Sequence, residues 1–523
     1  MLDKIAIYVG TIIQPESNKY FSFILNNESN IQIDSIVAIE VDLNVGGKSN
    51  IVLSKVRKIE TSYYIKNPDL YFLNKAANNQ LNNINQSNTQ YGIMAICDII
   101  GFFDFSDNIG FSASRERCGL YTPIPLQKVY LVPEKYLSSI YGISHNDKIS
   151  ICLGNIIHPF QSKADIQSNV FKTHTLISGI SGAGKTRLAS LIVKSLANRG
   201  SHVVIIDPHF EYLDLIVDKK NQPQLLVNIY SRYKKSYKTD RLNSQCKQLK
   251  DFNNIQKKKL EFSSRLLTAS TLCKILPNLS PQQQELIHSE FELAYKKYIE
   301  KKSEQNLLLY FYDYLNEQLL FREEEINQIE YIEKGKKVIF TYKINDYIEL
   351  KRKDTQYNVI ESIVKRLSDL IQEEMFTNEI PSWLDKSNAT IDIINEDFSD
   401  DEFGKRMVNT IISHFLEIRS DDKQRILVID EAHKLLNIED NHTKKLIFQL
   451  LRESRKFNTA LLLLTQNYDD LPPDILSLFH NVFRFKEVNN EDLRNLSSKM
   501  CHVNIVNSIC SYIMKVGEVP SYF

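Results

Sequence analysis

Two kinds of hydrophobic pattern divide the chain. In the first, short uninterrupted apolar runs at 203–206, 426–429 and 460–464 alternate with longer stretches of helical periodicity. Unbroken apolar runs are typical of strands buried on both faces, and strands separated by helices are typical of a parallel sheet. The pattern therefore predicts an α/β core over residues 166–212 and 386–523, with a parallel sheet flanked by helices.

The second pattern covers residues 1–165. Segments such as "KIAIYVGTII", "YFSFILN", "SIVAIEVD" and "IVLSKVRKIE" are short, rich in β-branched residues and separated by Asn, Asp, Gly and Ser. These features predict an N-terminal antiparallel β-barrel. Because its aromatic residues alternate as core residues do, we expect a scaffold more than a surface on which bases stack.

Residues 213–385 differ from both flanks. They are rich in Lys, Glu, Gln and Asn and contain helical patterns, one of which has Ser280 as the expected N-cap and Pro281 at the first helical position. We interpret this region as a helical insertion between core strands. Its charge runs, such as "QKKKLEF", are typical of solvated helix faces, although some could line a pore.

Composition sets only outer limits. The chain has 523 residues, 43% of them hydrophobic, which suffices for two or three cores. Lys+Arg and Asp+Glu both number 64, so the net charge neither indicates nor excludes a nucleic-acid partner. The cysteines are scattered, the stretch "MLDKIAIYVG" lacks the basic segment and apolar run typical of a signal peptide, and no apolar run reaches membrane-spanning length. We therefore expect a cytoplasmic protein with reduced thiols and no membrane association.

The chain's most glycine-dense stretch carries the chemistry. Residues 179–186 match the P-loop pattern G-x-x-x-x-G-K-[ST], after an apolar strand and before a helical stretch. Backbone N–H groups of such a loop surround phosphate oxygens, the Lys reaches the β- and γ-phosphates, and the Thr binds Mg²⁺. An ordinary glycine-rich turn is the alternative. The candidate residues for binding ATP are Gly179, Ser181, Gly182, Ala183, Gly184, Lys185, Thr186 and Arg187.

An acidic pair follows the apolar run 426–429. Asp430 is placed to hold Mg²⁺ together with Thr186, and Glu431 to polarise the attacking water. The pair favours hydrolysis over a metabolic kinase, which commonly lacks it. The alternative is a strand that ends in solvated carboxylates.

Two other strand ends carry polar residues. Asp207, His209 and Glu211 follow one apolar run, and Thr465 and Gln466 follow another. Because parallel strands place their ligands at the carboxyl edge, we expect at least one of the first three residues to position metal or water. Helix caps or surface groups are the alternative. Gln466 is placed to sense a γ-phosphate.

Several of these stretches resemble the HerA proteins of the HerA/FtsK group. The resemblance lies in "HTLISGISGAGKT", "DPHFEY", "VIDEAHKLL" and "RESRKFNTALLLLTQ", and in the flanking stretches "KISICLGNII" and "ATIDIINEDFSDDEFGKRMVNTIISHFLEIR". It extends over most of the chain outside roughly residues 215–385. The resemblance implies a RecA-like ATPase core. Phe210 stands where the family usually has Gly, and Asn467-Tyr468 where Arg-Pro is usual.

The resemblance also implies an arginine that acts on a neighbouring subunit's nucleotide. Arg452 and Arg455 precede the run 460–464, and Arg455 matches the family position better. The alternative is a basic helix end that opposes the helix dipole. The candidate catalytic residues are Glu431, Arg455, Gln466 and Glu211.

The function that the resemblance implies is a hexameric ring that translocates on double-stranded DNA. Such proteins work with a separate nuclease or with a sirtuin-like effector, in end processing or in defence against phage. Neither a nuclease motif nor a sirtuin motif is evident in this chain. The alternative is an ATP-regulated scaffold ring that controls an effector with little movement on DNA.

Overall fold

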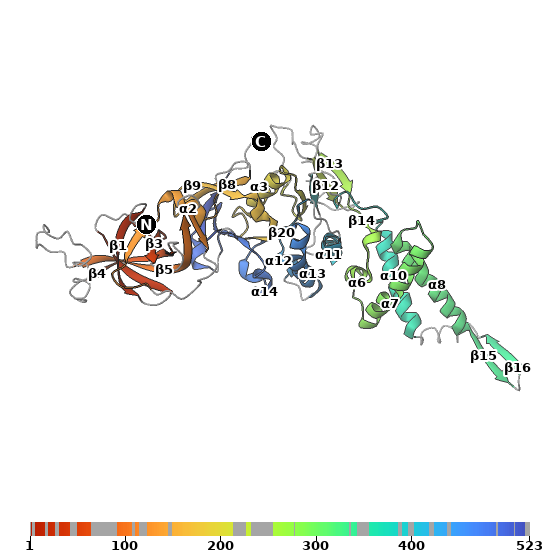
Figure 1. Cartoon of the computed structure of the whole chain (residues 1–523). Coiled ribbons are helices and arrows are strands. Elements are labelled where there is room, and N and C mark those ends of the chain that lie inside the picture. The colour runs from red at the N-terminus through yellow and green to blue at the C-terminus, as the bar shows by residue number, and fades with distance from the viewer. Residues whose placement is uncertain are drawn as a thin grey trace, which may run out of the picture. The chain divides into compact units, whose positions relative to one another are not determined.

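The structure is a computed structural model of the whole chain (Figure 1). The residues that it describes are 2, 6–15, 19–26, 31–41, 50–63, 91–106, 110–113, 123–144, 149–212, 226–231, 255–276, 278–333, 336–341, 355–384, 390–395, 402–417, 423–436, 441–487, 490–506 and 508–517.

The chain divides into two compact units. The first consists of Met1–Val170 and His480–Glu518, and the second contains Phe171–Phe479. Residues 480–518, which we assigned to the ATPase core, thus group with the N-terminal unit. The reason is strand pairing, because β23 (Tyr512–Val516) runs antiparallel to β8 (Ser150–His158). The boundaries of functional domains inside these units remain a prediction.

The N-terminal part of the first unit is a β-barrel, as the sequence predicts. Its strands pair in the order β2-β1-β7-β3-β4-β5, and β2 also pairs with β5, so these six strands of the described residues close. β6 extends β5. Alternate residues, such as Val9, Phe23 and Val52, fill the interior. The bounds are β1 (Ile7–Pro15), β2 (Tyr20–Leu25), β3 (Ile36–Val41), β4 (Asn50–Tyr63), β5 (Tyr91–Ser106), β6 (Gly110–Ala113) and β7 (Lys128–Leu131).

An antiparallel sheet completes the first unit. Its strand order is β21-β22-β23-β8-β9. Gly154 in β8 permits the close approach of β23, since a Cβ there would lie 2.1 Å from the carbonyl oxygen of Lys515. The remaining elements are α2 (Glu134–Ile140), β9 (Ser162–Gln167), β21 (Asn481–Arg484), α15 (Glu491–Arg494) and β22 (Met500–Asn504).

The second unit contains the predicted parallel sheet, in the order β13-β12-β18-β11-β19-β20-β10. Every residue of β11, β18, β19 and β20 is buried, which explains the unbroken apolar runs. α3 packs against β10, β11 and β20, and α13 packs against β20. The strands are β10 (Thr175–Ser178), β11 (His202–Ile206), β12 (Leu226–Ser231), β13 (Ile255–Lys259), β18 (Thr390–Ile394), β19 (Arg425–Ile429) and β20 (Thr459–Thr465). The sheet confirms the predicted fold class.

Helices and short turns accompany the sheet in this unit. α3 begins directly after the glycine-rich loop, and α13 leads through the turn η5 into β20. They are η3 (Ser168–Lys172), α3 (Lys185–Ala197), α11 (Glu402–Glu417), α12 (His433–Leu436), α13 (Asn441–Glu453), η5 (Ser454–Phe457), η6 (Tyr468–Asp470) and α14 (Pro473–Leu476). Within the described ranges, no helix has the length and apolar character needed to cross a bilayer.

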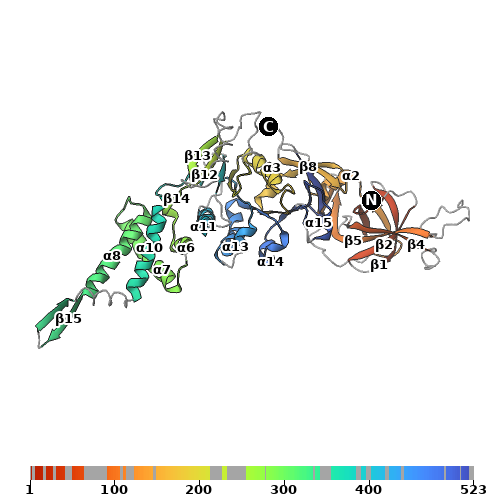
Figure 2. The ribbon, with the colours of Figure 1, turned by 180° about the vertical axis from the view of Figure 1, so that it is seen from behind.

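The predicted helical insertion is present but shorter than 213–385. α7, α8 and α10 pack together around a core that includes Phe311 and Leu367, and both ribbon views show them side by side (Figure 1, Figure 2). Ser280 caps α7 in a capping box with Gln283, as expected from the sequence. The elements are η4 (Ser264–Leu266), α6 (Ala269–Ile275), α7 (Pro281–Glu300), α8 (Leu307–Asn327) and α10 (Thr355–Gln372), with strands β14 (Phe262–Ser263), β15 (Gln328–Glu333), β16 (Lys336–Thr341) and β17 (Phe376–Thr377).

β12 and β13 correct that prediction. They lie inside residues 213–385 yet extend the parallel sheet beyond β18. Their sequence signal is weak, because β13 reads "IQKKK" and a polar Asn228 interrupts β12. The pairing of β12 with β18, and of β13 with β12, supplies the stability that local propensity does not.

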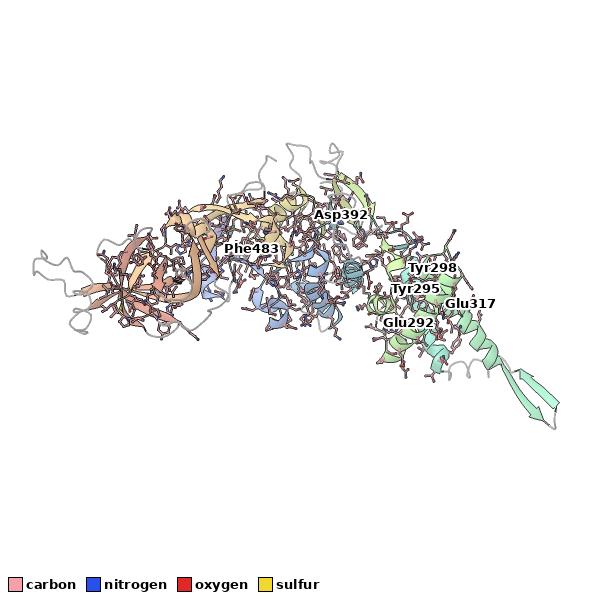
Figure 3. All side chains as sticks on the ribbon, in the orientation of Figure 1. Glu292, Tyr295, Tyr298, Glu317, Asp392 and Phe483 are labelled. Atoms are coloured by element: carbon pink, nitrogen blue, oxygen red, sulfur yellow. The ribbon has the colours of Figure 1, made fainter. Side chains whose placement is uncertain are left out.

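A buried polar network joins three of the parallel strands. Asp392 of β18, labelled in Figure 3, lies 2.7 Å from Nε2 of His202, and Asn228 donates to its other oxygen at 2.6 Å. The side chains of Asp392 and His202 are both fully buried. Thr390 also donates to Asp392, at 3.3 Å. The Asp392 carboxylate is therefore the common acceptor for side chains from β11, β12 and β18.

We expect D392A to lower the free energy of unfolding by about 3–5 kcal/mol, because it leaves buried donors without an acceptor. D392N keeps the shape and one acceptor and should lose less. Chemical denaturation of both variants tests this, with D474A, a change at an exposed residue of the same unit, as the control. Equal midpoints for D392A and D474A would contradict the structural role.

Candidate active site

The glycine-rich loop connects β10 to α3. Gly182 and Gly184 have φ angles of 75° and 112°, in the left-handed region that glycine adopts at little cost. The loop is anchored to β20, because the N–H of Gly179 donates to the carbonyl oxygen of Thr465 at 3.2 Å. Ser181 and Gly182 are exposed and Ala183 is buried. The residues at the tip of the loop are thus accessible to solvent, while Gly179 at its base is hydrogen-bonded to the sheet.

Lys185, the first residue of α3, folds back over this loop. Its Nζ donates to the carbonyl oxygens of Gly179 at 2.7 Å and of Ile180 at 3.2 Å. Only 6% of the residue is exposed, and this burial lowers the pKa of the ammonium while Asp430, Glu431 and Glu211 oppose the shift. A phosphate that replaced the two carbonyls would give the ammonium a charged partner.

The next residues of α3 meet the loop after β11. Thr186 Oγ1 donates to Oε2 of Glu211 at 3.4 Å, so the structure brings these two candidates together. Arg187 follows in the first turn of α3 and is half-buried. His209 is exposed and lies 3.3 Å from Nζ of Lys434 through its Nε2.

Asp207 lies at the end of β11 with 1% of the residue exposed. Its Oδ2 accepts the N–H of Tyr212 at 3.0 Å, and among the described residues its Oδ1 has no hydrogen-bond partner. Burial raises the pKa of this carboxyl to about 6, against the opposing effect of backbone N–H donors. Phe210, where the HerA pattern usually has Gly, is buried with a φ of 57°. In this chain a phenylalanine therefore adopts the left-handed backbone conformation at this position, and its side chain is buried.

Asp430 and Glu431 follow β19. Asp430 is 6% exposed, and burial, then the charge of Asp207, raises the pKa of its carboxyl to about 7. Its Oδ1 accepts the N–H of Glu431 at 2.8 Å. The carboxyls of Asp207 and Asp430 both have raised pKa values, and Oδ1 of Asp207 has no hydrogen-bond partner among the described residues. Such a pair fits a site that takes up a divalent cation. The assignment of Thr186 and Asp430 as the residues that hold Mg²⁺ stays a prediction.

Glu431 has a φ of 54°, a conformation that costs a non-glycine residue about 1–2 kcal/mol. Its Oε2 accepts a hydrogen bond from Nε2 of Gln466 at 3.0 Å. Gln466 follows β20, whose Thr465 pairs with Ser178 at the end of β10. The structure thus brings Glu431 and Gln466 together beside the strand that leads into the loop.

The sequence analysis missed one contact of Glu431. His433 Nε2 lies 3.4 Å from the same Oε2. Burial lowers the pKa of His433, while the charge of Glu431 opposes that shift. The signal was present in the stretch "VIDEAHKLL", but spacing alone does not tell whether a His three residues after Asp430 faces the site.

The two arginine candidates lie at the end of α13 and in η5. The Arg452 guanidinium lies over the Phe448 ring, 4.8 Å from its centroid. Arg455 belongs to η5, and its side chain is outside the described atoms. A role for Arg455 in a neighbouring subunit stays a prediction.

Comparison with known proteins identifies the family. Residues 151–417, just over half of the chain, match the family model "Helicase HerA, central domain". The chain belongs to the HerA helicase family. This confirms the resemblance seen in the sequence, and the chain is accordingly a P-loop ATPase. A second model, zonular occludens toxin (Zot), matches residues 362–489.

Individual HerA relatives are distant. The "Probable DNA double-strand break repair helicase HerA" of Methanocaldococcus jannaschii is 23% identical over 76% of this chain and 78% of its own length. The "DNA double-strand break repair helicase HerA" of Sulfurisphaera tokodaii is also 23% identical, over 71% of this chain and 65% of its own length. Among solved structures, the plasmid coupling protein TrwB in complex with ADP and Mg²⁺ is 14% identical, with a TM-score of 0.41, over 68% of this chain and 88% of that one.

The roles predicted for Lys185 and Glu431 separate nucleotide binding from hydrolysis. K185A should lose most of the affinity for ATP, because it removes the cation that faces the phosphates. E431Q should bind ATP normally and turn it over about 10²-fold or more slowly. Fluorescent-nucleotide titration and phosphate release measure the two effects. K194A, on the same helix, is the control, and unchanged turnover in E431Q would transfer the catalytic role to Glu211 or Asp207.

Proposed function

We propose that this HerA family member forms a hexameric ring that uses ATP and Mg²⁺ to move along double-stranded DNA. The observation that carries the proposal is the convergence of Lys185, Asp430, Glu431 and Gln466 at the carboxyl edge of one parallel sheet. This is the edge at which open α/β sheets bind their ligands.

Each residue has a distinct task in the proposed reaction. Lys185 leaves the loop carbonyls and holds the β- and γ-phosphates, and Gln466 senses the γ-phosphate. Glu431 accepts the proton of the attacking water. Thr186 and Asp430 would hold Mg²⁺, which neutralises charge on the phosphates when bound. Glu211, hydrogen-bonded to Thr186, is placed to orient that hydroxyl.

The partner and the setting are further parts of the proposal. The relatives named above are described as DNA double-strand break repair helicases, which supports double-stranded DNA as the track. We infer a separate nuclease or sirtuin-like effector, acting in end processing or in defence against phage, in the cytoplasm. The barrel would serve as a collar for the ring, residues 166–212 and 386–479 as the motor, and the helical cluster as an insertion of the motor.

Duplex DNA should raise the ATPase rate of the wild-type ring and leave E431Q inactive. Displacement of a third strand from a triplex should require ATP, since only a ring that moves along the duplex removes that strand. Single-stranded DNA of equal length serves as the control substrate. If duplex DNA does not change the ATPase rate and the third strand stays bound to the triplex, the ATP-regulated scaffold is favoured.

We expect Arg455 to act on the nucleotide of the adjacent subunit. An arginine supplied by a neighbour can contribute about 10³-fold or more to the rate. K185A and R455A should each be inactive alone, yet mixed rings should regain partial activity, because some interfaces then pair an intact loop with an intact arginine. R452A is the matched control. Mixed rings, verified by native mass spectrometry, that stay inactive would rule out this role.

A further inference from the structure

One oxygen of Glu431 has two neighbours that can donate to it. Gln466 Nε2 lies 3.0 Å from Oε2, and His433 Nε2 lies 3.4 Å from the same atom. The two donors come from different elements, because Gln466 follows β20 while His433 begins α12. The carboxylate side chain is only 11% exposed, so few waters can replace either donor.

The surroundings of His433 indicate which ring nitrogen carries the hydrogen. Its Nδ1 is buried and, within the described residues, has no hydrogen-bond partner. Burial lowers the pKa of the ring, which favours the neutral form. With one hydrogen to place, Nε2 is the ring nitrogen with an acceptor within reach, the Glu431 carboxylate at 3.4 Å. We therefore assign the Nε2–H tautomer.

A bound nucleotide would compete with Glu431 for the side-chain amide of Gln466. Its neighbour Thr465 accepts the N–H of Gly179, so Gln466 lies directly beside the base of the phosphate loop. A γ-phosphate is a stronger acceptor than one carboxylate oxygen that is already shared, since it carries more charge. If the amide turns to the phosphate, Glu431 loses the hydrogen bond that Gln466 donates to it.

The backbone of Glu431 does not have to move in that exchange. The N–H of Ala432 donates to Leu464 O at 2.9 Å, and the N–H of Lys434 donates to Glu431 O at 3.0 Å. These bonds fix the turn that follows Glu431. Only its side chain is released, and His433, on the same turn, remains within reach.

We propose that His433 is a positioning residue, which holds the Glu431 carboxylate in its catalytic orientation after Gln466 has turned to the γ-phosphate. The inference rests on the proposed ATP hydrolysis. In that reaction the water oxygen bonds to the γ-phosphorus, the bond from this phosphorus to the β–γ bridging oxygen breaks, and Glu431 takes the water proton, which leaves ADP and phosphate. His433 contacts none of the reacting atoms and acts through Glu431.

The test compares H433F, H433Q and the wild type in steady-state ATP hydrolysis. H433F removes the donor, and kcat should fall about 10-fold to 100-fold with KM for ATP unchanged. The reason is that a less well oriented Glu431 carboxylate slows the chemical step but does not change the binding of ATP. H433Q places an amide N–H close to the position of Nε2 and should recover most of kcat. H288F and H288Q, at an exposed His of α7, are the matched controls.

Each outcome decides the matter. A wild-type kcat in H433F, a changed KM with kcat intact, or an H433Q variant as slow as a folded H433F would overturn the role of His433 while ATP hydrolysis itself stands. If H433F does not fold, H433Q is compared with H433N, whose shorter amide reaches only the Nδ1 position, and equal rates would overturn the proposal. No turnover by the wild type would overturn the proposed function and this inference together.

Discussion

The register of the parallel sheet is the constraint on which the whole site depends. Ser178 pairs with Thr465, and Ile429 pairs with both Leu463 and Ile206. The residues that follow these positions therefore emerge at one edge, from four different strands. A slip by one residue in any pairing would turn the side chains of that strand to the other face and remove its contribution to the site.

Burial of charge at this edge gives the site its chemical character. Asp430 and Asp207 are both almost fully buried, and the charge of Asp207 raises the cost of ionising Asp430. The charge of Asp430 acts on the buried Lys185, whose ammonium is held by loop carbonyls. Buried carboxyls and a buried ammonium at one edge suit the site to a divalent cation and a phosphate, because each of these would pair with a buried charge.

Two residues near this edge have a left-handed backbone. Phe210 and Glu431 have positive φ angles in the loops that follow β11 and β19. The surrounding bonds hold Glu431 in that conformation, because Ala432 donates to Leu464 and Gln466 donates to its side chain. The buried Asp392 network also stiffens the sheet by joining β11, β12 and β18 through side chains. A rigid sheet with strained strand ends presents its functional groups in fixed directions.

The sequence alone predicts the individual motifs of the site, because each motif lies within a few consecutive residues. The loop at 179–186, the acidic pair after the run 426–429 and the helix start at Ser280 depend on residue type and short spacing, and the order of apolar runs predicts the parallel core. The family resemblance rests on the same short stretches. The placement of Thr186, Asp430, Glu431 and Gln466 near one edge follows from that pattern alone.

Tertiary structure decided what depends on contacts between distant segments. β12 joins the sheet by pairing with β18, a strand far along the chain, and β13 joins by pairing with β12, although the sequence of neither strand strongly favours a strand. Residues 480–518 group with the N-terminal unit through β23 and β8 for the same reason. The two donors on Glu431 follow from the direction of side chains on separate elements, since an apolar run fixes where a strand ends but not which atom its last side chain meets.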